Sequence, residues 1–239
     1  MKADLLGINI DFISYSELLE CIFGSDIRTI TYANQYVLNE SFRDDSLKHN
    51  LQSFDLIHPD GIGVQKALKK IYNENSARIT GSDLYYKIFD VLNKKRLSVF
   101  LYGSEPLVLK KAADYIRKNY ENISINGSID GFSDISNEAL VNYINESPSY
   151  ILFVGTGTPR QEEWIINNKH LIKAEKIISI GGGLRVISGD RIRGPVFMRK
   201  LGLEWLVRLF EEPVKNFKRY IIGIPLFLIR LNRQRKRMA

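Results

Sequence analysis

The stretch "FDLIHPDGIGVQKALKK" (residues 54–70) decides the fold of this chain. The apolar run "FDLIH" at its start is typical of a buried strand, and "GVQKALKK" at its end carries apolar residues at helical spacing. Asp60, Gly61 and Gly63 lie in the turn between them. Asp-Gly also favours a hairpin, but a hairpin needs a second strand after the turn, and a helical pattern follows instead. The stretch therefore predicts a strand, a turn and a helix, with Asp60 at the carboxyl end of the strand.

The same alternation of short apolar runs and amphipathic segments continues along the chain. The runs that predict strands are "RTITYA" (28–33), "FDLIH" (54–58), "LSVFLYG" (97–103), "ISINGSI" (123–129), "YILFVG" (150–155) and "KIISIGG" (176–182). Continuous apolar strands that alternate with helices indicate a parallel sheet covered on both faces. We predict an α/β fold over residues 1–195, with a Rossmann-like, doubly wound and mostly parallel sheet. The opening "DLLGINIDF" (4–12) predicts an extra strand pair at the edge of this sheet.

Residues 196–239 differ from the rest and predict a helical appendage. Residues 199–239 contain 11 Lys and Arg against 3 Glu, a balance of +8, while the rest of the chain has 23 basic and 24 acidic residues, a balance of −1. The apolar run "IIGIPLFLIRL" (221–231) is too short to span a bilayer and is flanked by cations. We expect this appendage to lie on an anionic membrane surface. The alternative is a helix packed in the protein's own core.

Composition limits the class of protein and its compartment. The chain has 239 residues, 44% of them apolar and 26% charged, which is typical of a globular protein. A single cysteine, Cys21, excludes an internal disulfide and favours a reducing compartment. The first residues do not resemble a signal peptide, and no run of about 20 apolar residues occurs. We therefore expect a cytoplasmic location.

Glycine-containing turns before predicted helices indicate a phosphorylated ligand. Glycines there let backbone N–H groups approach an anion, and the helix dipole favours negative charge. In "VGTGTPRQEEW" (154–164), Thr158, Pro159 and Gln161 predict a capping box. The candidates for substrate binding in these turns are Gly61, Gly63, Ser82, Asp83, Gly103, Ser104, Gly155, Thr156, Gly157, Arg160 and Glu162.

Several common cofactor and metal signatures are missing from the sequence. Arg160 stands where the dinucleotide fingerprint G-x-G-x-x-G needs its third glycine. The sequence has no P-loop motif, no Asp-x-Asp and no His/Cys cluster with the spacing of metal ligands. We therefore expect neither a cofactor nor a metal.

Eight stretches, taken together, resemble a known family. They are "TYANQYVLN", "DLIHPDGIGV", "RITGSDL", "LYGSEP", "GTGTPRQEEW", "GGGL", "SGDRIRGP" and "GLEWLVRLFEEPVKNFKRY", in this order. The chain is similar to the WecG/TagA/CpsF glycosyltransferases, glycosyltransferase family 26. The resemblance implies an inverting, metal-independent transfer of N-acetylmannosamine, or a related hexose or uronic acid, from a UDP-sugar to a polyprenyl-diphosphate-linked sugar. It also implies work on the inner face of the cytoplasmic membrane, in the synthesis of a cell-surface polysaccharide such as teichoic acid, capsule, exopolysaccharide or an antigen like the enterobacterial common antigen.

The resemblance assigns a role to Asp60. The family's D-G-x-G aspartate is its proposed catalytic base, and an inverting transfer needs one carboxylate to take the proton of the attacking hydroxyl. Asn34 matches the asparagine of the family's T-x-N pattern. Tyr32 stands where that pattern usually has threonine, and Thr31 comes one step earlier. Because side chains alternate faces along a strand, Thr31 and Tyr32 cannot both point at the substrate.

The resemblance also implies cations that neutralise the departing UDP, whose charge must otherwise be met by helix N-termini. Arginines of the family's appendage match Arg208, Lys215, Lys218 and Arg219. Where lysine replaces arginine, the charge remains but the bidentate fork is lost. Arg193 matches the arginine of the family's R-A-P motif, and Gln161 matches a contact to the uridine end by its position in the motif.

Two other interpretations remain at this stage. One is a nucleotide-dependent oxidoreductase on the same fold, against which the broken fingerprint argues. The other is a non-catalytic, basic nucleic-acid-binding protein, although the apolar run in the appendage (residues 196–239, the tail) fits a membrane better than a duplex. We expect no nucleic-acid partner. The sequence leaves open the donor sugar, the acceptor, the linkage, and whether the chain forms a homo-oligomer.

Overall fold

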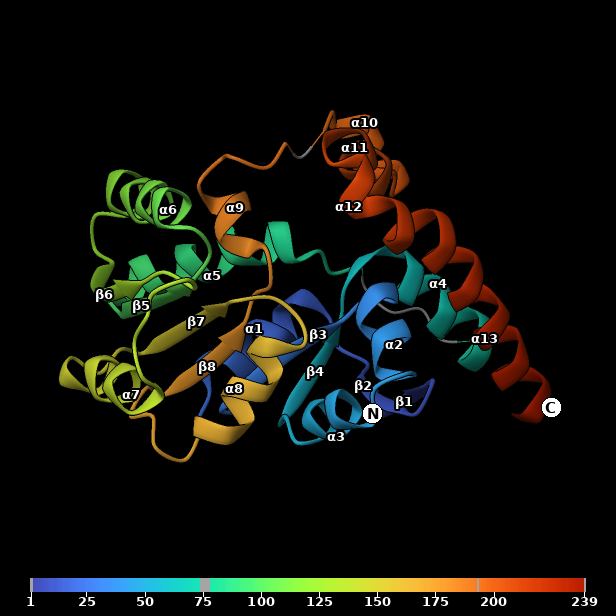
Figure 1. Ribbon diagram of the computed structural model, residues 1–239, viewed down its shortest axis with the longest axis horizontal. Helices are drawn as coiled ribbons and strands as arrows, with labels where there is room; N and C mark the ends of the chain where they lie inside the picture. The colour runs from blue at the N-terminus through green and yellow to red at the C-terminus, as the bar shows by residue number, and fades with distance from the viewer. Residues whose placement is uncertain (1, 74–77, 193, 239) are drawn as a thin grey trace.

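The computed structural model describes residues 2–73, 78–192 and 194–238, without the side chains of Lys200 and Lys215. A six-stranded parallel sheet lies between helices, and a string of C-terminal helices runs along one side of the molecule (Figure 1). The strands of this sheet are β3 (Thr29–Ala33), β4 (Leu56–Pro59), β5 (Ser98–Gly103), β6 (Ser124–Ile129), β7 (Ile151–Gly155) and β8 (Lys176–Ser179). The predicted α/β class with a parallel sheet is confirmed.

The strands follow the order β4-β3-β8-β7-β5-β6. From β5 the chain crosses outward to β6, whereas from β7 it crosses inward to β8. The two connections diverge between β7 and β5, so the sheet has a topological switch point there, where ligands of doubly wound sheets bind.

The N-terminal strand pair differs from the prediction. β1 (Lys2–Leu5) and β2 (Ile8–Asp11) form a separate two-stranded antiparallel sheet instead of extending the large one. The backbone N–H of Ile57 on the edge strand β4 donates to Oδ2 of Asp11 at 2.9 Å. A side-chain carboxylate thus satisfies an edge N–H that a further strand would otherwise pair with.

Two hydrophobic cores lie on opposite faces of the sheet. The sheet is flanked by α1 (Tyr15–Phe23), α2 (Gln35–Ser41), α3 (Asp45–Gln52), α4 (Gly61–Tyr72), α5 (Gly81–Lys95), α6 (Pro106–Asn119), α7 (Asn137–Glu146), α8 (Arg160–Asn168) and α9 (Gly183–Ile187). Along β7, Leu152 and Val154 join one core, while Ile151 and Phe153 join the other. Alternation of fully buried apolar side chains is what a strand covered on both faces requires.

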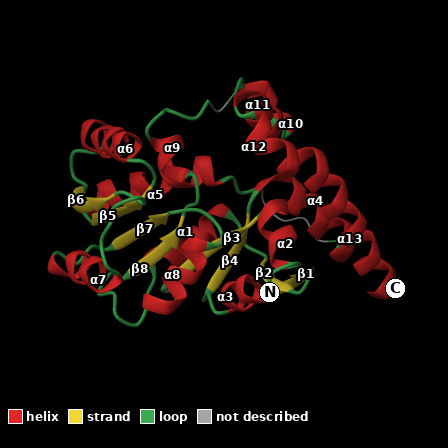
Figure 2. Cartoon of the chain, in the orientation of Figure 1, coloured by secondary structure: helices red, strands yellow, loops and turns green. Residues whose placement is uncertain are grey.

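The last of the C-terminal helices is docked on the main sheet domain (Figure 2), where α13 and the π-helical turn before it contact α2. They are α10 (Val196–Leu201), α11 (Glu204–Glu211), α12 (Pro213–Phe217), a π-helical turn (Lys218–Ile222) and α13 (Gly223–Met238). On α13, Phe227 and Leu231 are buried in a core shared with α2, while Leu228 and Ile229 are 49% exposed. The helix is therefore docked on one face and open on the other. The domain boundary between residues 195 and 196 stays a prediction.

No helix in the described part of the chain combines the length and apolarity needed to cross a bilayer.

Candidate functional site

Asp60 lies where three turns meet at the carboxyl ends of the strands. It follows β4 and precedes α4, but its side chain does not cap that helix. Instead Oδ1 accepts the N–H of Gly81 at 3.0 Å, and Oδ2 accepts Nδ2 of Asn34 at 3.3 Å. The next residue, Gly61, has φ +82°, a conformation that favours glycine, and no atom lies within 4 Å of where its Cβ would be. The carboxylate is therefore fixed in orientation beside open space.

Asn34 uses both the oxygen and the NH₂ group of its side-chain amide. Its Oδ1 caps α2 by accepting the N–H groups of Tyr36 and Val37, each at 3.0 Å, which leaves Nδ2 free to donate to Asp60. An aspartate could make the cap but has no donor for a second carboxylate. Both the cap of α2 and the hydrogen bond to Asp60 therefore require an asparagine at this position.

Thr31 and Tyr32 point to opposite sides of β3. Thr31 is fully buried and shares a 2.6 Å hydrogen bond with Ser179 on β8. The Tyr32 hydroxyl accepts Nε2 of Gln161 at 3.4 Å and contacts Gly181. Burial, and then the charge of Glu162, raise the pKa of Tyr32 to about 12. Tyr32 is therefore a protonated phenol. The charges of Asp60 and Arg219 also act on its pKa, so it lies on the same side of the sheet edge as they do.

The predicted capping box is wrong. α8 begins at Arg160, and the Thr158 hydroxyl donates to Oε1 of Glu162 at 3.1 Å instead of capping the helix. The Gln161 N–H bonds the carbonyl of Gly157, and its side chain links Glu162 at 2.7 Å to the N–H of Gly181 at 2.9 Å. Because the helix begins at Arg160, Gln161 does not stand at the third helical position that a capping box needs, and its Oε1 already accepts the N–H of Gly181. Gln161 is itself completely buried, so it holds the turn after β8 in place.

A groove of about 330 Å³ opens at the switch point between β5 and β7. Gly103, with φ +128°, lies against Gly155 so closely that a Cβ there would overlap the backbone carbonyl. The groove contains aromatic side chains and amides, and Tyr102 and Trp164 meet edge to face with 5.0 Å between ring centroids. Its lining residues are Tyr102, Gly131, Asn137, Thr156, Arg160, Glu163, Trp164, Asn167 and Asn168. The volume lies within the usual range for small-molecule sites.

The other turn candidates lie around these two centres. Ser104 (φ +62°) and Gly157 (φ +87°) continue the turns that follow β5 and β7. Asp83 accepts the hydroxyl of Thr80 at 2.8 Å at the start of α5. Ser82 lines a small cavity with two arginines, and Gly63 packs near Gln35.

Tail cations reach the Asp60 side of the sheet. Burial alone would lower the pKa of Arg208, but the Tyr220 hydroxyl and the charge of Asp60 raise it above its ordinary value. The Arg219 guanidinium lies 4.7 Å from the ring centroid of Tyr36. Lys218 is exposed. Of the other predicted cations, Arg193 lies outside the described residues, and the side chain of Lys215 is not described either.

Comparison with known proteins identifies the family. The model of the glycosyl transferase WecG/TagA/CpsF family matches residues 3–239. The chain belongs to this family. It is 33% identical over 228 residues to a Bacillus subtilis (strain 168) protein named N-acetylglucosaminyldiphosphoundecaprenol N-acetyl-beta-D-mannosaminyltransferase, with 94% of this chain and 86% of that protein covered. A Staphylococcus aureus (strain MW2) protein of the same name is 29% identical over 244 residues, covering 99% of this chain and 94% of that protein. The resemblance seen in the sequence is confirmed.

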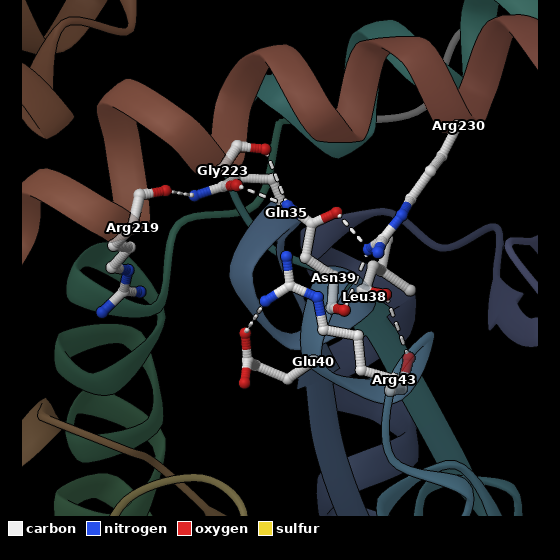
Figure 3. A network of polar contacts seen from close by, with 9 residues as sticks. Gln35, Leu38, Asn39, Glu40, Arg43, Arg219, Gly223 and Arg230 are labelled. Carbon is white, nitrogen blue, oxygen red and sulfur yellow. Dashed lines mark hydrogen bonds and ion pairs between the residues drawn. The ribbon is translucent and has the colours of Figure 1, made fainter.

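A polar joint fastens the tail of this WecG/TagA/CpsF protein to α2 (Figure 3). Gln35 donates to the carbonyl of Arg219 at 3.1 Å, and Asn39 donates to that of Gly223 at 2.7 Å. Arg230 donates to the backbone and side-chain oxygens of Asn39 at 3.0 and 2.8 Å. Since Asn34 caps this same helix, α2 connects the tail directly to the partner of Asp60.

Sequence reasoning missed Arg191, Tyr85 and Tyr220. The Tyr85 hydroxyl donates to the carbonyl of Ile180 at 2.9 Å, beneath the glycine turn after β8. Tyr220 is buried and hydrogen-bonds Arg208. Arg191 stands two residues before Arg193 in "DRIRGP", and its guanidinium packs on Gly182. The available signal was the presence of a second arginine beside the one that the family motif assigns.

Within the described ranges 2–73, 78–192 and 194–238, no three His, Cys, Asp or Glu residues cluster as metal ligands do. Independence from a metal remains a prediction.

Proposed function

We propose that this glycosyltransferase moves N-acetylmannosamine, or a closely related sugar, from a UDP-sugar to a polyprenyl-diphosphate-linked sugar with inversion. The observation that supports this most strongly is Asp60, a carboxylate oriented by Asn34 and Gly81 beside open space at the sheet edge. The names of the Bacillus subtilis and Staphylococcus aureus relatives supply the sugar and the lipid-linked acceptor. A cell-wall or capsular polymer is the expected end product.

The proposed chemistry needs one proton acceptor and one site for departing charge. The acceptor hydroxyl gives its proton to Asp60 as its oxygen bonds the anomeric carbon, on the face opposite the leaving group. The bond between that carbon and the β-phosphate oxygen breaks, and its electron pair leaves with UDP. Arg208 and Arg219 stabilise the new negative charge. Their partly buried positions next to Tyr220 and Tyr36 support this role because reduced contact with water strengthens such interactions.

The sheet order suggests how the donor lies. The groove at the β5–β7 switch point has the aromatic and amide groups that suit a nucleoside. Across the sheet, β7 and β4 are separated by three strand spacings, by way of β8 and β3. At about 4.8 Å each, they separate the groove from Asp60 by about 14 Å. That distance leaves room for a diphosphate between the nucleoside and the reacting sugar.

Location on the inner face of the cytoplasmic membrane is part of the proposal. The tail has a +8 charge balance, and many of its apolar side chains are exposed. Those of the tail helices include Val196, Phe197, Leu201, Phe210, Val214, Phe217, Ile221, Ile222, Leu228 and Ile229. Exposed apolar groups beside cations are the features of a protein that lies in the headgroup region of an anionic leaflet.

A donor and acceptor screen tests the proposed function. Full-length protein is mixed with each of several UDP-sugars and an N-acetylglucosaminyl-diphosphate lipid, and UDP release is followed with and without EDTA. We expect UDP-N-acetylmannosamine to be the best donor and EDTA to have no effect. Absence of transfer from every UDP-sugar would refute the proposed activity. Loss of turnover in EDTA that magnesium or manganese restores would refute metal independence.

A further inference from the structure

Arg191 faces Arg208 across a nearly closed cavity. Arg191 follows α9 on the sheet domain, whereas Arg208 comes from α11 of the tail. The cavity between them has a volume of about 10 Å³ and is lined by Ser82, Val186, Arg191, Ile192, Glu204 and Arg208. Such a volume accommodates about one water molecule. Two guanidinium groups on separately anchored elements therefore converge on one small space.

The charged groups around Arg191 are chiefly cations. Burial, followed by the charges of Arg208, Arg185 and Arg219, lowers the pKa of Arg191 to about 10, against a weaker opposing effect of Tyr220. Arg185 has its own partner, Glu212, at 2.9 Å.

Glu204 is the carboxylate that lines the cavity, and it has a partner elsewhere. Its Oε2 lies 3.7 Å from Nη2 of Arg78, and its charge also acts on Arg208. Burying like charges together is costly unless an anion joins them. Among the described residues, the nearby carboxylates Glu204 and Glu212 each pair with another arginine, so Arg191 is placed to receive a further anion.

We propose that Arg191 and Arg208 bind a diphosphate group between them, Arg191 from the sheet domain and Arg208 from the tail. This inference rests on the proposed function, because both substrates of that reaction carry a diphosphate. The planar fork of arginine suits phosphate oxygens, which it can bind in pairs. Because the cavity is almost closed, the diphosphate enters only when α11, which carries Glu204 and Arg208, moves away from the segment that carries Arg191 and Ile192. The position after β8, between the groove and Asp60, is where the donor's diphosphate is expected.

Gly182 makes room for the Arg191 guanidinium. A Cβ at Gly182 would lie 2.6 Å from Nη1 of Arg191, which is too close for contact. The backbone at Gly182 has φ −79°, so alanine fits it without strain. Gly182→Ala therefore displaces the end of a flexible side chain while the fold remains, and it tests the position of Arg191 independently of its charge.

The test compares ligands that differ only in their phosphates. Calorimetry with full-length protein measures the affinities of UDP, uridine and inorganic pyrophosphate for wild type, Arg191→Met, Gly182→Ala and the control Arg117→Met, which alters an exposed arginine on α6. We expect Arg191→Met to weaken UDP and pyrophosphate by about 10- to 100-fold, as for lost charge-assisted hydrogen bonds, and to leave uridine unchanged. Gly182→Ala should shift affinities in the same direction, and the control should shift nothing.

Kinetic constants separate the two sources of the diphosphate. A raised KM for the lipid-linked acceptor with unchanged UDP affinity assigns the site to the acceptor's diphosphate, and the reverse assigns it to the donor's. If Arg191→Met and Gly182→Ala keep the wild-type ratio of UDP to uridine affinity, the wild-type pyrophosphate affinity and both KM values, the proposal is wrong. Because pyrophosphate binding needs no turnover, this result is independent of whether the screen of UDP-sugars finds activity.

Discussion

Asp60 accepts two hydrogen bonds, and an asparagine in its place could keep one of them. In Asp60→Asn, the amide oxygen still accepts the N–H of Gly81, but the new NH₂ meets the NH₂ of Asn34 and cannot take a proton. We expect the turnover number to fall by about 10²- to 10⁴-fold, the usual contribution of a general base, with UDP affinity unchanged. Turnover with saturating donor is the measurement, and Asp114→Asn on the surface of α6 is the control. Near wild-type turnover would remove Asp60 from the mechanism.

Glu162 makes a pH-dependent contribution to stability. Burial raises the pKa of its carboxyl, which accepts Thr158 and Gln161 at Oε1, while Oε2 has no hydrogen-bond partner among the residues that the structure describes. Between the unfolded and folded pKa values, the native state keeps a proton that the unfolded chain loses. The stability contribution is therefore full below the unfolded pKa and decreases as the pH rises towards the folded one.

Two substitutions at Glu162 test this account by chemical denaturation between pH 4 and 8. Glu162→Gln mimics the protonated carboxyl, so we expect it to abolish the pH-dependent decrease and to match or exceed wild-type stability at pH 8. Glu162→Ala leaves the Thr158 and Gln161 donors without an acceptor and should cost about 1–3 kcal/mol. If Glu162→Gln is less stable than wild type at pH 8, the carboxylate is the native form.

Single residues show how far the sequence could predict the site. Asp60 and Asn34 were predictable because each follows a clear strand run, and turns at strand ends meet at one edge of the sheet. The choice between Thr31 and Tyr32 was not, because strand alternation separates them without fixing which face is inward. Arg191 was missed because its partner cations come from an appendage whose docking no local pattern records.

At the scale of elements, α2 is short but connects two parts of the molecule. Asn39→Ala removes the amide donor to Gly223 and the amide oxygen that accepts from Arg230, so the buried guanidinium keeps the backbone oxygen of residue 39 and the Phe42 ring. We expect a loss of about 1–3 kcal/mol and faster proteolysis of the tail, since an unsatisfied buried charge is costly. Limited proteolysis and denaturation of Asn39→Ala are compared with Asn119→Ala, an exposed amide on α6. Equal protection of the tail in both variants would contradict a joint at α2.

Periodicity correctly predicted the elements whose burial is visible in the local sequence. All six predicted runs contain a strand of the large sheet, since continuous apolar residues between turn signals require burial on both faces. The strand pair β1–β2 formed, but its placement was wrong because pairing with an edge depends on long-range contacts such as Asp11 to Ile57. The capping box at Thr158 failed for a similar reason, because α8 begins one residue later than predicted and the side-chain oxygen of Gln161 accepts the distant N–H of Gly181.

At the scale of the whole molecule, the tail combines the two alternatives that the sequence left open. Phe227, Arg230 and Leu231 repeat at helical spacing on the docked face of α13 and are buried. The exposed face carries Leu228 and Ile229, followed by a strongly basic end. The composition indicated an apolar, cationic segment. Only the docking of α13 on α2 and the β1–β2 pair shows which of its faces is left exposed and could contact a membrane.

The two faces of α13 predict opposite phenotypes. Leu228→Ser with Ile229→Ser removes two half-exposed apolar side chains, worth together about 2 kcal/mol of membrane partition, so binding to anionic vesicles should fall about 30-fold. Unfolding and turnover on a short soluble acceptor should not change. Phe227→Ala on the buried face should instead cost about 3–5 kcal/mol of stability.

Co-sedimentation with anionic and neutral vesicles at two salt concentrations measures the binding, and denaturation measures the stability. Higher salt should weaken the anionic binding that remains in Leu228→Ser/Ile229→Ser, because the basic end is still present and its charges are screened. If the double variant binds anionic vesicles as wild type does, the membrane contact lies elsewhere. The exposed apolar groups of α10 to α12 would then be the surface that meets the lipid, and α11 among them also carries Arg208.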